Sequence, residues 1–442
     1  NPNVPTELLP DQVSSKLHKP DASLLVVFFD TTTSDEKTLE TVARIREIGN
    51  ENTYVSSLSS LVLDLKNLCE EEESKYVMVA VLFSLIAMML LLDSYAAPFF
   101  FLICIGIAIM YNLGSNILFG EISYITKAIA AVLQLGVTMD YSIFLWHSYT
   151  ENEDRGLDDE AAMAKAIDNT LISVMGSSVT TVAGFLALCF MSYTMGRDLG
   201  LVMAKGVILG VLSSITILPA LILQFKGLLH KTRHPSLIPD AHKLAHGLTS
   251  RYVIYIIVFV LLLFPALYGY QHQNLVYDFS KMISSSQGEL PPEKTQFLTA
   301  NQKLYQNFGI ESSYLVLISD QLPAHEGKEM IQEMEELDGI VSVLGLDKAL
   351  GTSVPKEILP EDVRTSVESQ EHQIIVLNSG FRVSTDECNE QIDRVKAIAK
   401  RYDPEAAVIG EEPATLDLIR LTDKDFERVN WISIALVFFI IL

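Results

Sequence analysis

One carboxylate and the tyrosine beside it are the residues whose position points most directly to chemistry. Asp140 and Tyr141 lie in the inner half of an apolar stretch, residues 122–146. A stretch of this length crosses a bilayer as a helix, which takes about 20 residues. An ionisable side chain at that depth is costly and usually functional. We interpret Asp140 as a proton or cation relay; a structural Asp held by a neighbouring hydroxyl or amide is the alternative.

Helical spacing places other polar and small residues around this pair. Gly136 lies one turn before Asp140 and leaves open space beside its carboxyl group. Gln134 and Thr138 form a second polar line with Tyr141 on the same helix. A face of this kind is predicted to lie inside a helix bundle, away from lipid.

Small and hydroxylated residues recur on the apolar segments that follow. Ser173, Ser177 and Thr181 share one broad helical face, which is typical of helix packing in membranes. Support of the relay is the alternative role for them. Gly206 and Gly210 form a GxxxG pair, which predicts a close approach of another helix.

A bundle of membrane-spanning helices must position these residues. Of the 442 residues, 49% are hydrophobic, and they gather into segments long enough to cross a bilayer. The chain is therefore predicted to be a polytopic membrane protein. The predicted segments are 76–92, 96–116, 122–146, 170–193, 199–225, 252–271 and one beginning near 429.

Composition and motifs exclude several classes of function. The net charge of −23 argues against nucleic acid as a partner. The chain has no phosphate-binding glycine loop and no Cys/His cluster with metal-ligand spacing, so neither a cofactor nor a metal is expected. Its four cysteines are expected to be free thiols. An enzyme is not expected, because Asp140 has no second carboxylate, metal cluster or nucleophile near it in the sequence.

The segments between the spans predict an orientation and two soluble regions. Residues 226–251 are rich in Lys and Arg, which places this loop in the cytoplasm. The same orientation puts the acidic connection 148–169 inside and both soluble regions outside. Alternating patterns in these regions predict small α+β units. Strands are expected at 24–29, 53–56, 313–319, 340–344 and 373–377, and helices at 34–49, 58–73, 324–338 and 384–401.

An internal repeat relates the two soluble regions. The sequence VPTELLPDQVSSKL (4–17) matches VPKEILPEDVRTSV (354–367), and YVSSLSSLVLDL (54–65) aligns with VIGEEPATLDL (408–418). In both copies an expected strand and amphipathic helix lie between the matches, and a charged stretch then leads into a membrane span. Duplication predicts a second membrane half after residue 442, and internal repeats of this kind are typical of transporters.

The motifs resemble those of the resistance-nodulation-division superfamily, and most closely its MMPL branch. GVTMDYSIFL (136–145) is similar to the Gly-x-x-x-Asp-Tyr signature of the fourth span. The resemblance continues through GSSVTTVAGFLALCF (176–190) and the Pro-ended GVILGVLSSITILPALI (206–222). It covers essentially the whole chain.

The resemblance implies a tandem-repeat architecture with extracytoplasmic porter domains built from ferredoxin-like βαβ units. On that template the chain is a fragment that lacks the first span and spans nine to twelve. The implied parts are the end of the first porter domain (1–74), spans two to six (75–225), a cytoplasmic loop (226–251), span seven (252–271), the second porter domain (272–428) and the start of span eight (429–442).

The resemblance also implies a mechanism. Asp140 and Tyr141 match the pair that carries protons in the family, and a second such pair would face it from the missing half. The implied function is proton-driven export of lipid-like or amphipathic molecules across the plasma or inner membrane. Partners would be the bilayer, the substrate and protons, with a homo-oligomer or accessory envelope proteins in addition. A non-transporting lipid sensor or assembly scaffold with the same fold is the alternative.

Overall fold

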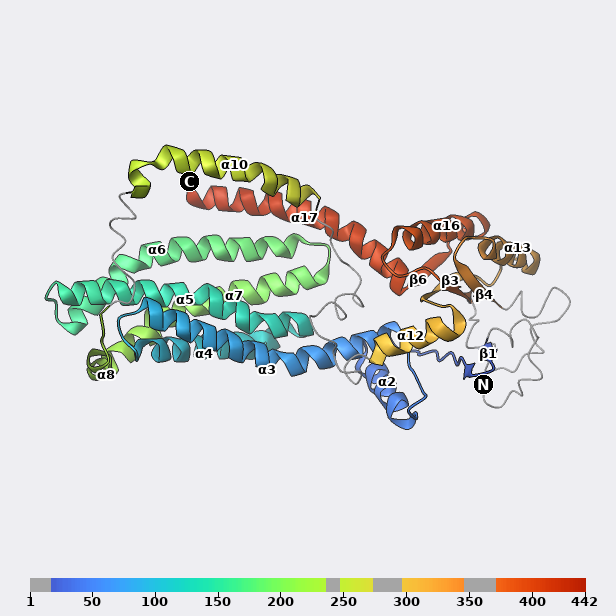
Figure 1. Cartoon of the computed structure of the whole chain (residues 1–442), viewed down its shortest axis with the longest axis horizontal. Coiled ribbons are helices and arrows are strands. Elements are labelled where there is room, and N and C mark those ends of the chain that lie inside the picture. Colours follow the sequence, from blue (N-terminus) through green and yellow to red (C-terminus); the bar gives the residue numbers. More distant parts are fainter. Residues whose placement is uncertain (1–16, 236–246, 273–295, 346–370) are drawn as a thin grey trace. The chain divides into compact units, whose positions relative to one another are not determined.

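The computed structural model describes residues 17–235, 247–272, 296–345 and 371–442. The chain divides into two compact units (Figure 1). The α+β unit comprises Asn1–Leu68 and Val276–Arg420, and the helical unit comprises Cys69–Leu275 and Leu421–Leu442. The first pair of matching segments in the repeat, 4–17 and 354–367, lies outside the described residues.

The α+β unit is built on a four-stranded antiparallel sheet in the order β4-β5-β3-β6. Tyr314, Val316 and Ile318 of β3 alternate toward the core, as expected for a sheet that buries one face. The predicted strands here are confirmed, and a short further strand, β6, completes the sheet. The strands are β3 (Ser312–Ser319), β4 (Ile340–Leu344), β5 (His372–Ser379) and β6 (Ala407–Gly410).

Two amphipathic helices bury their apolar faces in the core of this sheet. They are α13 (Ala324–Glu335) and α16 (Asp386–Tyr402), and both confirm predicted helices. Met330 and Val395 are fully buried there together with the side chains of β3 and β5. In chain order the described elements run β3-α13-β4-β5-α16-β6.

The N-terminal part of the α+β unit contains helix α2 (Glu36–Ile48), which begins after Asp35 and ends at Gly49 as predicted. Arg46 near its end forms an ion pair of 2.5 Å with Asp64 of helix α3 (Leu58–Leu91). The same carboxylate accepts the backbone N–H of Phe297 at 2.8 Å, at the start of helix α12 (Gln296–Phe308).

The strands expected at 24–29 and 53–56 are not formed, so this prediction is wrong. The described strands nearby are only β1 (His18–Lys19) and β2 (Ala22–Ser23), which pair with each other. Leu25 and Val27 are 82% and 58% exposed, and the segment pairs with no described strand, although Phe29 at its end packs against Leu39 and Val42. A run of β-branched and aromatic residues becomes a strand only where a neighbouring strand supplies hydrogen bonds.

The helical unit contains helices that are long and apolar enough to cross a membrane, and six are found among the described residues. They confirm six of the seven predicted segments. The seventh lies within α17 (Glu411–Ile441), which is not among the six. The six are α3 (Leu58–Leu91), α4 with the short helix η2 (Ala97–Phe119), α5 (Tyr124–Asp154), α6 with η3 (Asp159–Phe190), α7 (Thr194–Gln224) and α10 (Tyr252–Gln271).

Several of these helices continue well beyond their apolar parts. Residues 148–169 were expected to form a connection, but α5 runs to Asp154 and α6 begins at Asp159. Likewise, the predicted helix 58–73 and the span 76–92 form one helix, α3. Hydropathy marks the apolar part of a helix, whereas polar residues with good helix propensity extend it into water.

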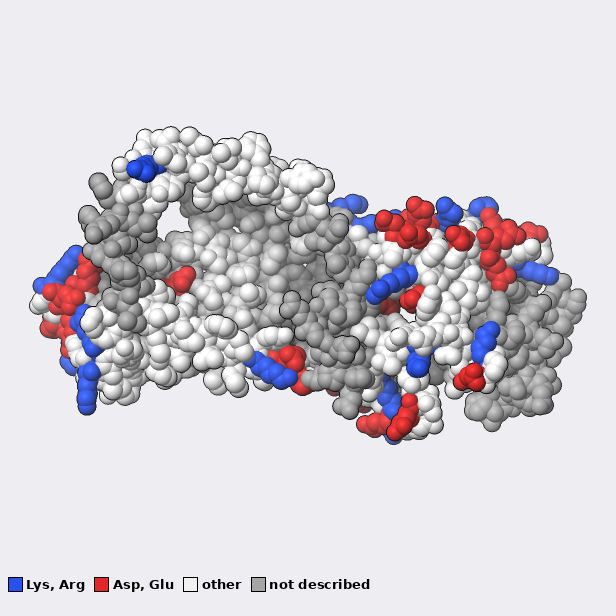
Figure 2. Space-filling model, viewed as in Figure 1, with Lys and Arg blue, Asp and Glu red and all other residues white. Residues whose placement is uncertain are grey.

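The turn between α3 and α4 is held by a segment far along the chain. Asp93 O accepts the backbone N–H of His234 at 2.8 Å, and its carboxylate accepts Arg233 Nε at 3.0 Å and Trp146 Nε1 at 2.7 Å. Ser94 pairs with Arg233 in an isolated β-bridge. Figure 2 shows charged side chains gathered at this end of the helical unit, by the α5–α6 turn and the short helix α8 (Lys226–Lys231).

Candidate proton-relay site

Tyr141 is held between three helices in the middle of the helical unit. Its side chain is 4% exposed and packs against Val174 of α6 and Val207 and Val211 of α7. Its hydroxyl group lies near the side chain of Thr181 of α6. The structure therefore brings together two of the predicted relay residues, Tyr141 and Thr181, from different helices.

Asp140 lies on the outer surface of α5. It is exposed, and within the described part of the chain it makes no hydrogen bond or ion pair. Gly136, one turn earlier, is also exposed, and a Cβ added there would meet no atom within 4 Å. The predicted open space beside the carboxyl group is therefore present. Of the polar face that was expected inside the bundle, Gln134, Thr138 and Tyr141 are buried, whereas Asp140 and Gly136 are exposed in the described structure.

Ser173 and Ser177 of α6 are exposed in the helical unit, as Asp140 is. The Ser177 carbonyl accepts the hydroxyl of Thr181 at 2.9 Å. No hydrogen bond joins either serine side chain to Asp140 in the described residues. Their part in the relay stays a prediction.

Gln134 acts as a clamp between three helices. It is fully buried, its Oε1 accepts Asn112 Nδ2 of α4 at 2.9 Å, and its Nε2 donates to Gly206 O of α7 at 3.1 Å. Both ends of the amide are thus occupied by helix–helix contacts. The sequence leaves Gln134 either a relay-supporting or a helix-packing role, and this geometry favours packing. Asn112 was missed, since nothing in its local sequence shows which residue faces it.

Lys205 of α7 is directed inward toward neutral oxygen atoms. Its Nζ donates to Asn112 O at 2.9 Å and Asn116 Oδ1 at 2.6 Å, and lies 4.7 Å from the centre of the Phe119 ring. Together with the Gln134 clamp, these contacts fix α4, α5 and α7 against one another. The helix that carries Asp140 and Tyr141 is therefore rigidly supported on one side.

The GxxxG prediction is confirmed by a close approach of α5 to α7. A Cβ at Gly210 would collide with the Thr138 Cγ2 methyl, and the Thr138 hydroxyl is held by Gln134 O at 2.7 Å.

We expect Gly210→Ala to cost about 1–3 kcal/mol of stability through overpacking. Thermal unfolding of the purified protein should show the lower midpoint. Gly184→Ala is the matched control, because an added Cβ there meets no atom within 4 Å; equal midpoints for the two variants would contradict the prediction.

Comparison with known proteins gives a consistent picture. The model of the MMPL family matches residues 19–233. The putative membrane protein MJ1562 of Methanocaldococcus jannaschii is 26% identical over 224 residues, which cover 48% of this chain and 58% of the relative.

Two named exporters of Mycobacterium tuberculosis are also similar over shorter regions. The siderophore exporter MmpL5 is 27% identical over 188 residues, covering 41% of this chain and 19% of the exporter. The trehalose monomycolate exporter MmpL3 is 27% identical over 103 residues, covering 23% and 11%. The chain thus spans less than two thirds of the length of these relatives. Together with its six apolar helices, these similarities identify a multi-pass membrane protein.

Proposed function

We propose that the protein, whose residues 19–233 match the model of the MMPL family, is a membrane exporter driven by the proton-motive force. The observation that carries the proposal is the placement of Asp140 and Tyr141. A carboxylate without a partner lies on the surface of an apolar helix, next to a tyrosine buried between helices. A charge exposed to lipid at that depth costs several kcal/mol. We infer that other helices or water cover Asp140 in the membrane and that its carboxylate loads and releases protons.

The conduction path we propose runs from Asp140 to Tyr141 and on to Thr181. The supporting observation is that the hydroxyl of Tyr141 lies near Asp140 of α5 and near Thr181 of α6. The open space at Gly136 leaves room for the partner that covers the carboxylate. Gln134 and Lys205 hold the helix in place from the opposite side. Proton loading would then change how α5 packs against the helices that cover it.

We propose that the α+β unit is part of the porter domains and has a ferredoxin-like fold. The supporting observation is its topology: elements in the order βαββαβ form an antiparallel sheet in the order β4-β5-β3-β6. The domain boundaries inferred from the sequence stay proposals. They are a porter part at 1–74, spans at 75–225 and 252–271, a cytoplasmic loop at 226–251, a second porter domain at 272–428, and the start of a span at 429–442.

The proposed duplication is supported by a pair of ion pairs at aligned positions. Arg46 of α2 binds Asp64 of α3, and Lys396 of α16 binds Asp417 of α17, at 2.5 and 3.3 Å. In both places a helix of the α+β unit contacts the helix that follows it and continues into the helical unit. The same pairing in two copies is what duplication predicts.

The proposed class of substrate is based on the named relatives and not on a binding pocket in the structure. MmpL3 is named as an exporter of trehalose monomycolate and MmpL5 as a siderophore exporter. We therefore propose a lipid-like or amphipathic cargo. The plasma or inner membrane is the proposed location, with the porter parts outside and a homo-oligomer or accessory envelope proteins as further partners. No enzymatic step is included, because the named exporters are transporters.

The test is transport by the full-length protein in liposomes with an imposed pH gradient. Candidate lipids and amphiphilic drugs are supplied in turn, and cargo movement and lumenal pH are followed together. The exporter proposal expects cargo movement that stops when a protonophore collapses the gradient. Cargo movement that survives the protonophore would contradict proton coupling. Tight lipid binding without any movement would favour the sensor or scaffold function instead.

A further inference from the structure

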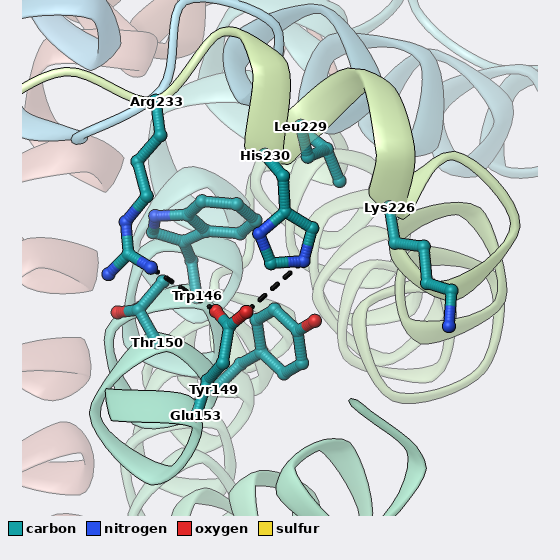
Figure 3. Close-up of a pocket in the computed structure, with 8 residues that line it drawn as sticks. All are labelled: Trp146, Tyr149, Thr150, Glu153, Lys226, Leu229, His230 and Arg233. Carbon is teal, nitrogen blue, oxygen red and sulfur yellow. Dashed lines mark hydrogen bonds and ion pairs between the residues drawn. The ribbon is translucent and has the colours of Figure 1, made fainter. Parts of the chain in front are cut away.

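Three side chains of the kinds that bind metal ions meet where helices α5, α6 and α8 come together. Glu153 lies in the last turn of α5, Asp159 is the first residue of α6, and His230 lies in α8. His230 Nε2 is 3.1 Å from Glu153 Oε1 and 3.8 Å from Asp159 Oδ1. One ligand atom from each residue lies within 4.8 Å of the others. Figure 3 shows Glu153 and His230 directed toward each other.

Each carboxylate uses one oxygen for His230 and the other for a cation. Glu153 Oε2 accepts Arg233 Nη1 at 3.4 Å, and Asp159 Oδ2 accepts Lys226 Nζ at 2.5 Å. These contacts orient both carboxylates so that the remaining oxygen of each faces the His230 imidazole. In metal sites, outer hydrogen bonds of this kind orient the ligands.

A buried hydroxyl group, that of Tyr149, belongs to a small pocket that Glu153 and His230 also line. Tyr149 is 2% exposed, and its hydroxyl lies near the Asp159 carboxylate but has no hydrogen bond of normal geometry. In Figure 3 it is directed into the space beside Glu153 and His230. The free volume of the pocket is about 10 Å³, close to the roughly 10–15 Å³ that holds one water molecule. A single ion fits this space, whereas an organic molecule does not.

The charges around the pocket leave an excess of negative charge. Four carboxylates contact its basic residues: Asp93 and Asp154 bind Arg233, and Glu153 and Asp159 make the contacts described above. Among the described residues, Arg233 and Lys226 are the permanently charged cations that form ion pairs with these four carboxylates. Two negative charges therefore remain unbalanced when His230 is neutral, which is the charge of one divalent cation.

We propose that Glu153, Asp159 and His230 bind one divalent transition-metal ion, with Zn²⁺ as the representative. Imidazole together with carboxylate oxygens is a ligand set that suits Zn²⁺, whereas Mg²⁺ prefers oxygen ligands alone. The Tyr149 hydroxyl or a water molecule completes the coordination. The bound ion joins the α5–α6 turn to α8. This inference does not rest on the proposed export function.

The sequence predicted no metal site because these ligands are not clustered along the chain. Glu153 and Asp159 flank a turn, whereas His230 follows two long helices later. Local spacing rules detect ligands on one loop or one helix. The site exists only after α8 packs on the α5–α6 turn.

The test is Zn²⁺ titration of the purified full-length protein, with any affinity tag removed, in competition with a coloured chelator. The proposal expects one Zn²⁺ ion in this site per chain and binding at least tenfold weaker in His230→Gln and Glu153→Gln. Excess Mg²⁺ should not displace the ion. Zn²⁺ should also raise the midpoint of thermal unfolding in the wild type and not in His230→Gln.

His234→Gln is the matched control, because it removes a nearby imidazole that stacks on Tyr95 and is not part of the cluster. Its Zn²⁺ affinity should stay within about twofold of the wild type. His230 is half exposed, so its replacement by Gln is compatible with folding, and circular dichroism checks the helix content. Equal Zn²⁺ affinity in the wild type and both ligand variants, or no binding at all, would overturn the proposal and leave an ion-pair network.

Discussion

Replacing Asp140 by asparagine is expected to reduce cargo-dependent proton flux to the leak of protein-free liposomes, with the fold unchanged. Asparagine has the shape of aspartate but cannot carry a proton on and off at neutral pH. In the described structure the Asp140 carboxylate has no hydrogen bond or ion pair to lose, so stability should change little. The measurement is lumenal pH in liposomes under an imposed gradient, with a cargo that the wild type moves.

Two further variants make this experiment specific to the relay. Tyr141→Phe removes the hydroxyl that interacts with Thr181 and should slow the flux while keeping the packing against Val207 and Val211. Asp198→Asn is the control: this carboxylate accepts the Ser123 N–H at 3.3 Å at another place in the helical unit. Its flux should remain. If Asp140→Asn moves cargo and protons as the wild type does, Asp140 is structural and the proposed mechanism is wrong.

Replacing Glu412 by glutamine is expected to flatten the pH dependence of stability in the α+β unit. The Glu412 side chain is 2% exposed; its Oε1 accepts the Ser313 N–H at 3.1 Å, and its Oε2 has no hydrogen-bond partner. Burial raises the pKa of this carboxyl group to about 8, from an ordinary value of 4.5. The folded unit therefore prefers Glu412 protonated at neutral pH.

The direction of the effect follows from the two pKa values of Glu412. Below about pH 4.5 the carboxyl group is protonated in the folded and unfolded states, and its burial carries no charge penalty. As the pH rises toward about 8 only the folded state keeps the proton, so stability falls; above that pH the loss is complete. At about 1.4 kcal/mol per pKa unit, the loss is at most about 5 kcal/mol.

Hydrogen exchange of the β3 amides, corrected for intrinsic rates, measures this pH dependence. Glu412→Gln should protect these amides more than the wild type near pH 8 and similarly near pH 5. Glu390→Gln is the control, because this carboxylate on α16 of the same unit is 74% exposed. A pH profile that keeps its wild-type slope in Glu412→Gln would show that Glu412 is not the titrating group.

The apolar period of the sequence was sufficient to predict most helices and the sheet. The short apolar runs in SYLVLIS and QIIVL predicted β3 and β5, which bury Val316 and Ile375 against the helices. The segment 24–29 is also a short apolar run, but it has no partner strand in the described structure. Periodicity therefore reports which side of a segment is apolar, whereas hydrogen bonding to a neighbour decides whether it becomes a strand.

The sequence pointed to the residues of the candidate site but not to their contacts, and their role as a relay stays a prediction. The position of Asp140 in an apolar segment was visible in the sequence, whereas the proximity of Tyr141 to Thr181 was not. The amide clamp at Gln134 was not visible, because its partners Asn112 and Gly206 lie on α4 and α7. Contacts between three helices depend on the rotation of each helix about its axis and on the register between the helices. The apolar periodicity of the sequence does not determine either of them.

The α3–α4 turn also sets an order of assembly in the membrane. Asp93 and Ser94 are satisfied by residues of the segment that ends at His234, and Arg233 lies 140 residues after Asp93. At a synthesis rate of about 5–20 residues per second, that separation corresponds to a delay of roughly 7–28 seconds. During this time Asp93 and Ser94 have been synthesised, whereas Arg233 and His234 have not. Lipid, water or the insertion machinery must shelter these groups until the residues after α8 arrive, so this turn is completed only after α4 to α8 have been made.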